Sequence, residues 1–202
     1  MKKIRGWRQM NNYFSFIDLI LMNRKNVEHS GILVWGYRGM GKTTCLRGIY
    51  HQIEDYNTLH PENEISSIFA TDIDQIDICD CLFLDDFGTK FNKRDFSTTE
   101  NKEFVKLLQE VRTNIPVILV SSPSYFMLDK DLRNFFTPAQ ILSKSDARFL
   151  LNVSGATFSV PKPSDKLLKE FRDQELEERK NRFSRAMDKV KTAHAKKNGI
   201  KS

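Results

Sequence analysis

Short apolar runs alternate along this chain with longer segments in which apolar residues recur at helical spacing. The short runs predict strands, several of them continuous enough to be buried on both faces, at 32–35, 65–70, 81–84 and 117–120. The periodic segments predict helices that pack one face against a core, at 13–23, 42–56 and 98–114. This alternation predicts an α/β fold with a mostly parallel central sheet flanked by helices.

The pattern changes after residue 123. A short helix is expected near 128–136, and alternating segments at 148–153 and 157–160 predict a hairpin that turns at Ser154-Gly155. The prolines that follow the hairpin mark the end of a domain, which we place at 1–163. Its nucleotide core would span 31–123.

Beyond this domain, residues 164–202 predict a charged C-terminal helix or tail. It is acidic as far as Glu178 and mainly basic from Arg179 onward. This basic run carries a set of candidate DNA contacts, Arg179, Lys180, Arg182, Arg185 and Lys189. They would neutralise phosphates without reading sequence, and the competing interpretation is a solvated charged helix.

Composition narrows the class of protein without identifying a partner. The 202 residues are 40% hydrophobic and 29% charged, which is enough for one domain with a substantial core. No run approaches the roughly 18 uncharged apolar residues of a membrane span, and no export signal follows the basic start. We therefore expect a cytoplasmic protein without a membrane partner. The net charge of +6 favours a polyanionic partner.

The cysteines and histidines show no metal-ligand spacing. Cys45, Cys79 and Cys81 form no CxxC pair and are interpreted as buried free thiols. Cys79 and Cys81 would share one face of a strand. The histidines are scattered, so no transition-metal site is expected.

The segment after the run at 32–35 has the spacing of a phosphate-binding loop. It reads Gly36-Tyr37-Arg38-Gly39-Met40-Gly41-Lys42-Thr43, between a predicted strand and a predicted helix. Its glycines let backbone N–H groups turn towards phosphates at the helix N-terminus. Lys42 would contact the β- and γ-phosphates, and Thr43 would bind Mg²⁺. We therefore predict an ATP and Mg²⁺ site over 36–44, which includes Thr44, with Arg38 pointing outward.

The run at 81–84 ends in two carboxylates, Asp85 and Asp86. At the carboxyl edge of a parallel sheet, Asp85 would lie beside the phosphate loop and hold Mg²⁺. Asp86 would polarise the attacking water as a general base, a role in which glutamate is more usual. Lys42, Asp85 and Asp86 are the predicted catalytic residues.

Two further pairs of residues are candidates for roles at the γ-phosphate. Ser121 or Ser122 would sense it by hydrogen bonding, or else form the turn before Pro123. Arg133 and Arg148 are candidates for an arginine finger offered to a neighbouring subunit, or are surface ion-pair partners. A finger given across an interface would require a homo-oligomer.

Together these residues resemble a known class of ATPase. Gly36–Thr43, Leu82–Asp86 and the strand end at Ser121-Ser122 resemble the additional-strand ATPase branch of P-loop NTPases. Asp85-Asp86-Phe87-Gly88 is similar to the Asp-Asp-Leu-Gly signature of DnaC/IstB-type helicase loaders of the AAA+ superfamily. The predicted hairpin departs from the helical lid of AAA+ proteins and looks more like FtsK/HerA or Zot-like motor ATPases. The small size resembles ATPases of viruses and plasmids.

Three functions follow as hypotheses. The first is a Mg²⁺-dependent, oligomeric ATPase that acts on DNA in loading, translocation, replication or packaging. The second is a slow ATP-dependent switch or assembly factor, which the aspartate at position 86 favours. The third is a small-molecule kinase, which is disfavoured because no Arg-rich lid is evident. GTP is disfavoured because no Asn-Lys-x-Asp motif occurs.

Overall fold

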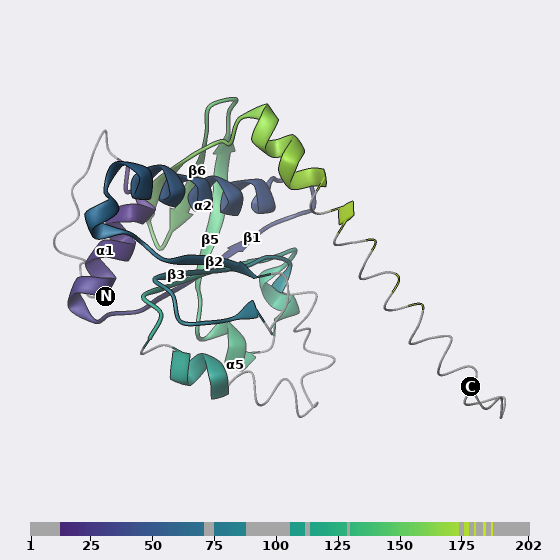
Figure 1. The fold of residues 1–202 in the computed structure, drawn as a ribbon. Helices are drawn as coiled ribbons and strands as arrows, with labels where there is room; N and C mark the ends of the chain where they lie inside the picture. Colours follow the sequence, from purple (N-terminus) through teal and green to yellow (C-terminus); the bar gives the residue numbers. More distant parts are fainter. Residues whose placement is uncertain are drawn as a thin grey trace, which may run out of the picture. The chain divides into compact units, whose positions relative to one another are not determined.

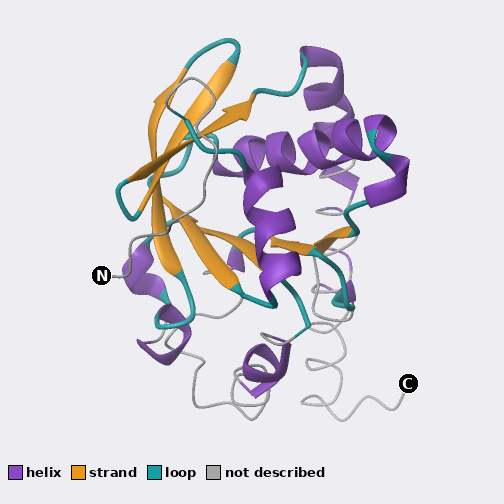
Figure 2. Cartoon of the chain, turned by 90° about the vertical axis from the view of Figure 1, so that its left-hand side faces the viewer, coloured by secondary structure: helices purple, strands orange, loops and turns teal. Residues whose placement is uncertain are grey.

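A single sheet organises the first part of the chain in the computed structural model (Figures 1 and 2). The structure describes residues 13–70, 75–87, 106–111, 114–128 and 130–173, together with residues 176, 177, 180, 184 and 187. The chain divides into two compact units, Met1–Lys162 and Pro163–Ser202. The sheet lies in the first unit.

Within the described residues the sheet has seven strands, in the order β2-β3-β4-β1-β5-β6-β7. Their bounds are β1 (Ser30–Trp35), β2 (Ser67–Ala70), β3 (Cys81–Leu84), β4 (Val117–Ser122), β5 (Thr137–Lys144), β6 (Arg148–Val153) and β7 (Ala156–Pro161). The neighbours from β2 through to β5 pair in parallel, whereas β5, β6 and β7 pair antiparallel. The predicted α/β class with a mostly parallel sheet is confirmed, and so is the hairpin that turns at 154–155.

Helices cover both faces of this sheet. Their bounds are α1 (Phe16–Asn26), α2 (Lys42–Leu59) and α5 (Lys130–Arg133), with 3₁₀ turns η1 (Pro61–Asn63) and η3 (Tyr125–Met127). A further helical stretch is described at 106–111, while 98–105 lies outside the described residues. Helices α1 and α2 lie on one side of the sheet and α5 on the other (Figure 1). None of the described helices is long and apolar enough to cross a membrane.

Helix α1 begins later than the periodicity predicts, at 16 instead of 13. Ser15 caps it, because its hydroxyl accepts a 3.1 Å hydrogen bond from the N–H of Ile17. Phe14 is not helical: its N–H donates to the carbonyl of Thr157 at 2.8 Å, and the residue bridges to β7. The first two described residues therefore extend the sheet edge.

Two apolar cores fill the space between sheet and helices. The core beneath α1 and α2 includes the fully buried residues Phe16, Ile20, Cys45, Ile49, Phe83 and Phe149. The core on the opposite face includes Leu33, Leu82, Leu108, Ile118, Leu128 and Leu132. Consecutive residues of β3 thus enter different cores, which explains why a strand buried on both faces has no polar alternation.

The cysteines are buried and free, as predicted, but their placement differs from the expectation. Cys81 begins β3 and packs in the core beneath α1 and α2, whereas Cys79 precedes the strand and packs in the other core. The prediction that both share one face is wrong, because strand alternation applies only within the strand. Burial raises the pKa of the Cys79 thiol to about 11 and that of Cys81 well above its ordinary value.

The second unit is described only in part. Residues 165–173 form a helix, and residues 176, 177, 180, 184 and 187 are also helical. Among the predicted DNA contacts, Lys180 is helical and exposed. Arg179, Arg182, Arg185 and Lys189 lie outside the described residues.

Candidate nucleotide-binding site

The loop between β1 and α2 has the backbone conformation that its glycines permit. Gly39 and Gly41 both have φ of +85°, in the left-handed region where a side chain is strained. Gly41 is the N-cap of α2, and Lys42, Thr43 and Thr44 are the first residues of the helix. The loop is therefore positioned at the positive end of an 18-residue helix, where an anion is favoured.

Lys42 is held against this loop. Its side chain is buried, and Nζ donates to the carbonyl oxygens of Gly36 at 2.7 Å and Tyr37 at 3.0 Å. Burial lowers the pKa of the ammonium below its ordinary value. The carboxylates of Asp86 and Asp85 oppose this effect and Arg38 adds to it. An ammonium enclosed in this way is a charge that gains from a bound anion.

Asp85 connects three elements of the sheet's carboxyl edge. Its Oδ2 accepts a 2.9 Å hydrogen bond from the Thr43 hydroxyl of α2, and its Oδ1 accepts one of 2.5 Å from the Ser121 hydroxyl of β4. The Ser121 oxygen in turn accepts from the N–H of Asp86 at 2.9 Å. Ser121 can contact both aspartates because β4 is the neighbour of β3 in the sheet and lies between β3 and β1.

These oxygens fit the ligand preference of Mg²⁺. This ion takes oxygen ligands, among them carboxylates and the hydroxyl that follows the lysine of a phosphate loop. Thr43 Oγ1 and Asp85 Oδ2 are such oxygens, and a hydrogen bond of 2.9 Å joins them. In the part of the chain that the structure describes, no three His, Cys, Asp or Glu side chains gather as a metal site. A Mg²⁺ ion here would accordingly take its other ligands from phosphates and water, as is usual for this ion.

Ser121 and Ser122, the two predicted γ-phosphate sensors, have different hydrogen-bond partners. The Ser122 hydroxyl donates to the carbonyl of Ser124 at 2.8 Å, so it serves the turn, whereas Ser121 contacts Asp85. Asp86 is exposed, with φ of +51°. The Ser121 hydroxyl therefore contacts the predicted magnesium ligand, whereas the Ser122 hydroxyl bonds within the turn. That either serine senses a γ-phosphate stays a prediction.

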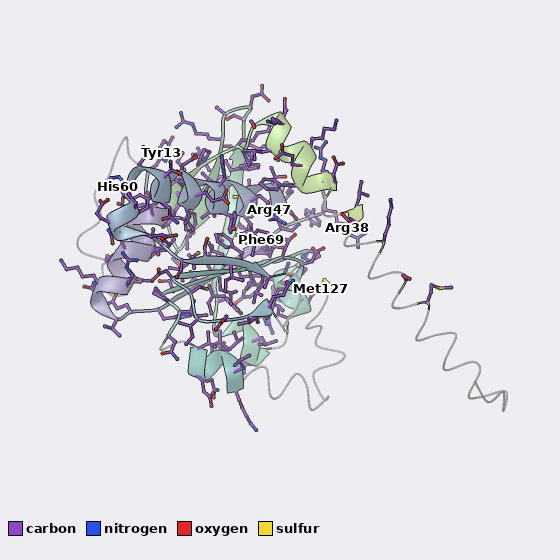
Figure 3. All side chains as sticks on the ribbon, in the orientation of Figure 1. Tyr13, Arg38, Arg47, His60, Phe69 and Met127 are labelled. Carbon is purple, nitrogen blue, oxygen red and sulfur yellow. The ribbon has the colours of Figure 1, made fainter. Side chains whose placement is uncertain are left out.

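The three arginine residues considered in the sequence analysis lie on three different elements. Arg133 on α5 has its guanidinium carbon 5.5 Å from the ring centroid of Tyr125 and 5.6 Å from that of Phe126. Arg148 is exposed at the first position of β6. Arg38 is exposed on the loop itself (Figure 3). Whether any of the three meets a second subunit stays a prediction.

Two residues at the loop were not expected from the sequence. A Cβ added at Gly41 would lie 3.0 Å from Cε1 of Phe149 and 3.6 Å from Nζ of Lys144. Both residues belong to the β5–β6 hairpin. The sequence pattern held no signal for them, because their place depends on the parallel pairing of β5 with β1, which brings the carboxyl ends of both strands to one edge.

The sequence pattern predicted no strand at the position of β5. Pro138, the second residue of β5, has no N–H donor and is therefore unfavourable in a strand. The pairing register with β6 also shifts between Ile141 and Ser143, which breaks the alternation that predicts a strand.

The fold and the loop together define the class: the chain has a P-loop NTPase fold. No family model and no curated protein sequence matches the chain. It is similar to the N-terminal domain of zonular occludens toxin from Neisseria meningitidis, with 16% identity and a TM-score of 0.42 over 69% of this chain and 96% of that one. A second similar structure is Thermomonospora curvata EccC (ATPases 2 and 3) in complex with a signal sequence peptide. There the identity is 10% and the TM-score 0.29, over 67% of this chain and 32% of that one.

Proposed function

We propose that this chain binds Mg²⁺ and ATP between the β1–α2 loop and the ends of β3 and β4, and hydrolyses the ATP. The observation that carries the proposal is the 2.9 Å contact between Thr43 and Asp85. This contact joins the first turn of α2 to the acidic end of β3. A threonine hydroxyl and an aspartate carboxylate in these places are the protein groups that position the metal beside the phosphates in phosphoryl transfer.

Each residue of the site has a distinct part in this proposal. The bound Mg²⁺ would neutralise developing charge on the phosphates. Lys42 exchanges its loop carbonyls for phosphate oxygens, and the N–H groups of the loop bind the remaining ones. Ser121 orients Asp85 through Oδ1 and leaves Oδ2 to Thr43 or the metal. Asp86, exposed beside them, accepts a proton from the attacking water.

The position of β4 supports the additional-strand ATPase branch. Strand β4 lies between β1, which leads into the loop, and β3, which ends in Asp85. That interposed strand delivers Ser121 to the site. A further step, that an oligomer acts on DNA, rests on the basic residues from Arg179 onward in the sequence.

The conformation of Asp86 favours a second candidate function, a nucleotide switch that hydrolyses ATP slowly. Its side chain is shorter than the more usual glutamate, and its φ of +51° is an uncommon backbone state. Both features limit how well a carboxylate can be aimed at water. The switch would bind Mg²⁺ and ATP at the same residues.

Nucleotide binding and steady-state turnover of the wild type and Lys42→Ala test the proposal. We expect wild-type binding that weakens when EDTA removes Mg²⁺, and loss of binding and turnover in Lys42→Ala. Lys25→Ala is a matched control, since Lys25 is exposed near the end of α1. Binding by Lys42→Ala at wild-type affinity would contradict the proposed site. Tight binding with negligible turnover would select the switch.

A further inference from the structure

The β5–β6 hairpin contains a β-bulge that changes the direction of one lysine. Ile141 pairs with Leu151, but Ser143 pairs with Leu150 and Lys144 with Phe149. If the register of Ile141 and Leu151 continued without a bulge, Lys144 would instead pair with Arg148. Because directly paired residues of an antiparallel ladder share a face, the bulge puts Lys144 on the face of Phe149.

That face is the one that carries the phosphate loop. Phe149 is fully buried in the core beneath α1 and α2, and its ring edge meets the position of a Cβ at Gly41. The Lys144 ammonium lies 3.6 Å from the same position and 5.9 Å from the centroid of the Phe149 ring. The lysine therefore lies against the first turn of α2.

Lys144 adds a positive charge close to the amino end of α2. The amino end of α2 is the positive end of the helix dipole. The same end of the helix carries the ammonium of Lys42, whose pKa responds to the guanidinium of Arg38 and to the carboxylates of Asp85 and Asp86. The acidic residue of the hairpin turn, Asp146, lies 4.0 Å from Lys162. A further cation at this end of the helix gains most when a polyanion binds.

We propose that Lys144 is a second phosphate-binding residue of the nucleotide site, supplied by the β5–β6 hairpin. The proposal rests on the nucleotide site proposed above and adds a cation from outside the loop. Lys42 reaches the phosphates from within the loop, and Lys144 reaches them from the neighbouring hairpin. Nucleotide binding would thereby tie the hairpin to the start of α2.

Titration of the full chain with ATP and Mg²⁺ tests this role. The variants are Lys144→Gln, Lys144→Arg and the matched surface control Lys25→Gln. We expect the Kd for ATP to rise about tenfold in Lys144→Gln, because an exposed side chain loses one charge-assisted contact. The slope of Kd against salt concentration becomes shallower, since one cation fewer contacts phosphate. Lys144→Arg keeps most of the affinity, and Lys25→Gln matches the wild type.

Melting of the empty protein separates phosphate binding from a structural role. Lys144→Gln should melt no lower than the wild type without nucleotide, because it removes a charge from the positive end of α2. Unchanged ATP affinity in Lys144→Gln overturns the proposal. The proposal is also overturned if Lys144→Gln melts below the wild type without nucleotide and Lys144→Arg loses as much ATP affinity as Lys144→Gln. If neither the wild type nor Lys25→Gln binds ATP, the proposed function itself is wrong and the role of Lys144 falls with it.

Discussion

At the residue scale, the burial of Lys42 disfavours the charged form of its side chain. The ammonium makes hydrogen bonds to two loop carbonyls, yet burial still lowers its pKa. A residue that costs stability until its ligand arrives is typical of a binding site. The pH dependence of stability should therefore reveal it.

We predict that the empty wild type gains stability relative to Lys42→Met as pH rises towards 10.5, the ordinary pKa of lysine. Between the lowered folded pKa and 10.5, the unfolded chain binds more protons than the folded one. The free energy of unfolding contributed by Lys42 therefore increases with pH in that window. Urea unfolding of both proteins at about pH 7 and about pH 10 measures the effect. Parallel pH profiles would contradict it.

The two left-handed glycines of the loop offer a matched pair of substitutions. Gly39 and Gly41 share a φ of +85°, but a Cβ at Gly39 meets nothing within 4 Å, whereas one at Gly41 meets Phe149 at 3.0 Å. Gly39→Ala should cost about 1 kcal/mol from backbone strain. Gly41→Ala should cost more and should weaken nucleotide binding. Thermal unfolding and ATP titration of both variants test this, and equal costs would argue against contact between loop and hairpin.

A third prediction concerns Ser121, which positions Asp85. Ser121→Ala removes the 2.5 Å hydrogen bond to Asp85 and the acceptor for the Asp86 N–H. We expect a loss of turnover of about tenfold, with smaller losses in ATP affinity. Ser122→Ala is the control, because its hydroxyl contacts Ser124. A larger effect in Ser122→Ala would reverse the assignment of the two serines.

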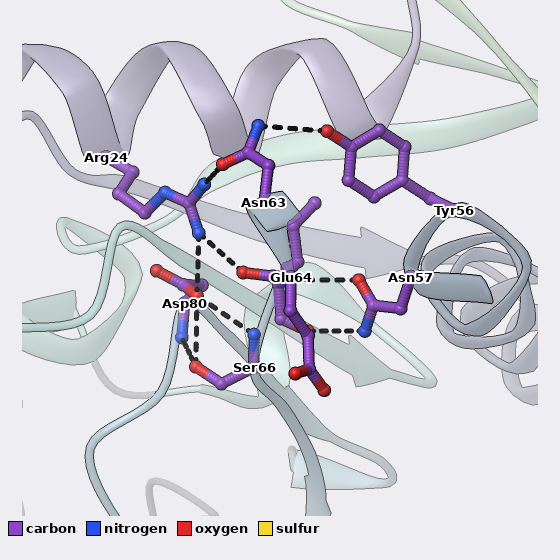
Figure 4. A network of polar contacts seen from close by, with 8 residues as sticks. Arg24, Tyr56, Asn57, Asn63, Glu64, Ser66 and Asp80 are labelled. Carbon is purple, nitrogen blue, oxygen red and sulfur yellow. Dashed lines mark hydrogen bonds and ion pairs between the residues drawn. The ribbon is translucent and has the colours of Figure 1, made fainter. Parts of the chain in front are cut away.

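At the element scale, β3 is held at both of its ends. Asp85 follows its carboxyl end, and Asp80 precedes its amino end in a polar network (Figure 4). Asp80 Oδ2 accepts from the N–H of Ser66 at 2.9 Å, from its hydroxyl at 3.0 Å and from Arg24 at 3.3 Å. Arg24 also donates to the carbonyl of Glu64 at 2.8 Å. This network joins α1 to the chain before β2 and before β3.

We predict that Asp80→Ala lowers stability by about 1–2 kcal/mol, because Ser66 and Arg24 lose a shared acceptor. ATP affinity should not change, since the network lies at the end of β3 opposite to Asp85. Urea unfolding and ATP titration measure the two effects. Asp55→Ala is the control, as its side chain is exposed and lies 3.7 Å from His51. A loss of affinity in Asp80→Ala would show coupling between the two ends of the strand.

At the scale of the whole molecule, the described residues of the candidate phosphate site belong to the first compact unit and the candidate DNA contacts to the second. We predict that truncation separates the two proposed functions. A chain that ends at Glu178 should keep wild-type ATP affinity. If the basic residues bind DNA, it should lose DNA binding at low salt and any DNA-stimulated turnover. Filter binding at two salt concentrations tests this, and DNA binding retained by the truncated chain would locate the contact elsewhere.

Much of the fold was predictable because it depends on short-range pattern. The continuous apolar runs at β1, β3 and β4 can be satisfied only by a sheet covered on both faces. The glycines and Lys42 of the loop form a motif in which conformation and chemistry lie within a few consecutive residues. The acidic end of β3 was likewise visible, because a parallel sheet brings strand ends together.

The sequence by itself determined the α/β class, the candidate phosphate loop and the predicted catalytic carboxylates. Tertiary structure decided which of Ser121 and Ser122 meets Asp85, since side chains at successive strand positions point in opposite directions. It also decided that β5 pairs with β1 and that a bulge turns Lys144 towards Gly41. A bulge is a property of two paired strands, so its effect on Lys144 cannot be read from one strand alone.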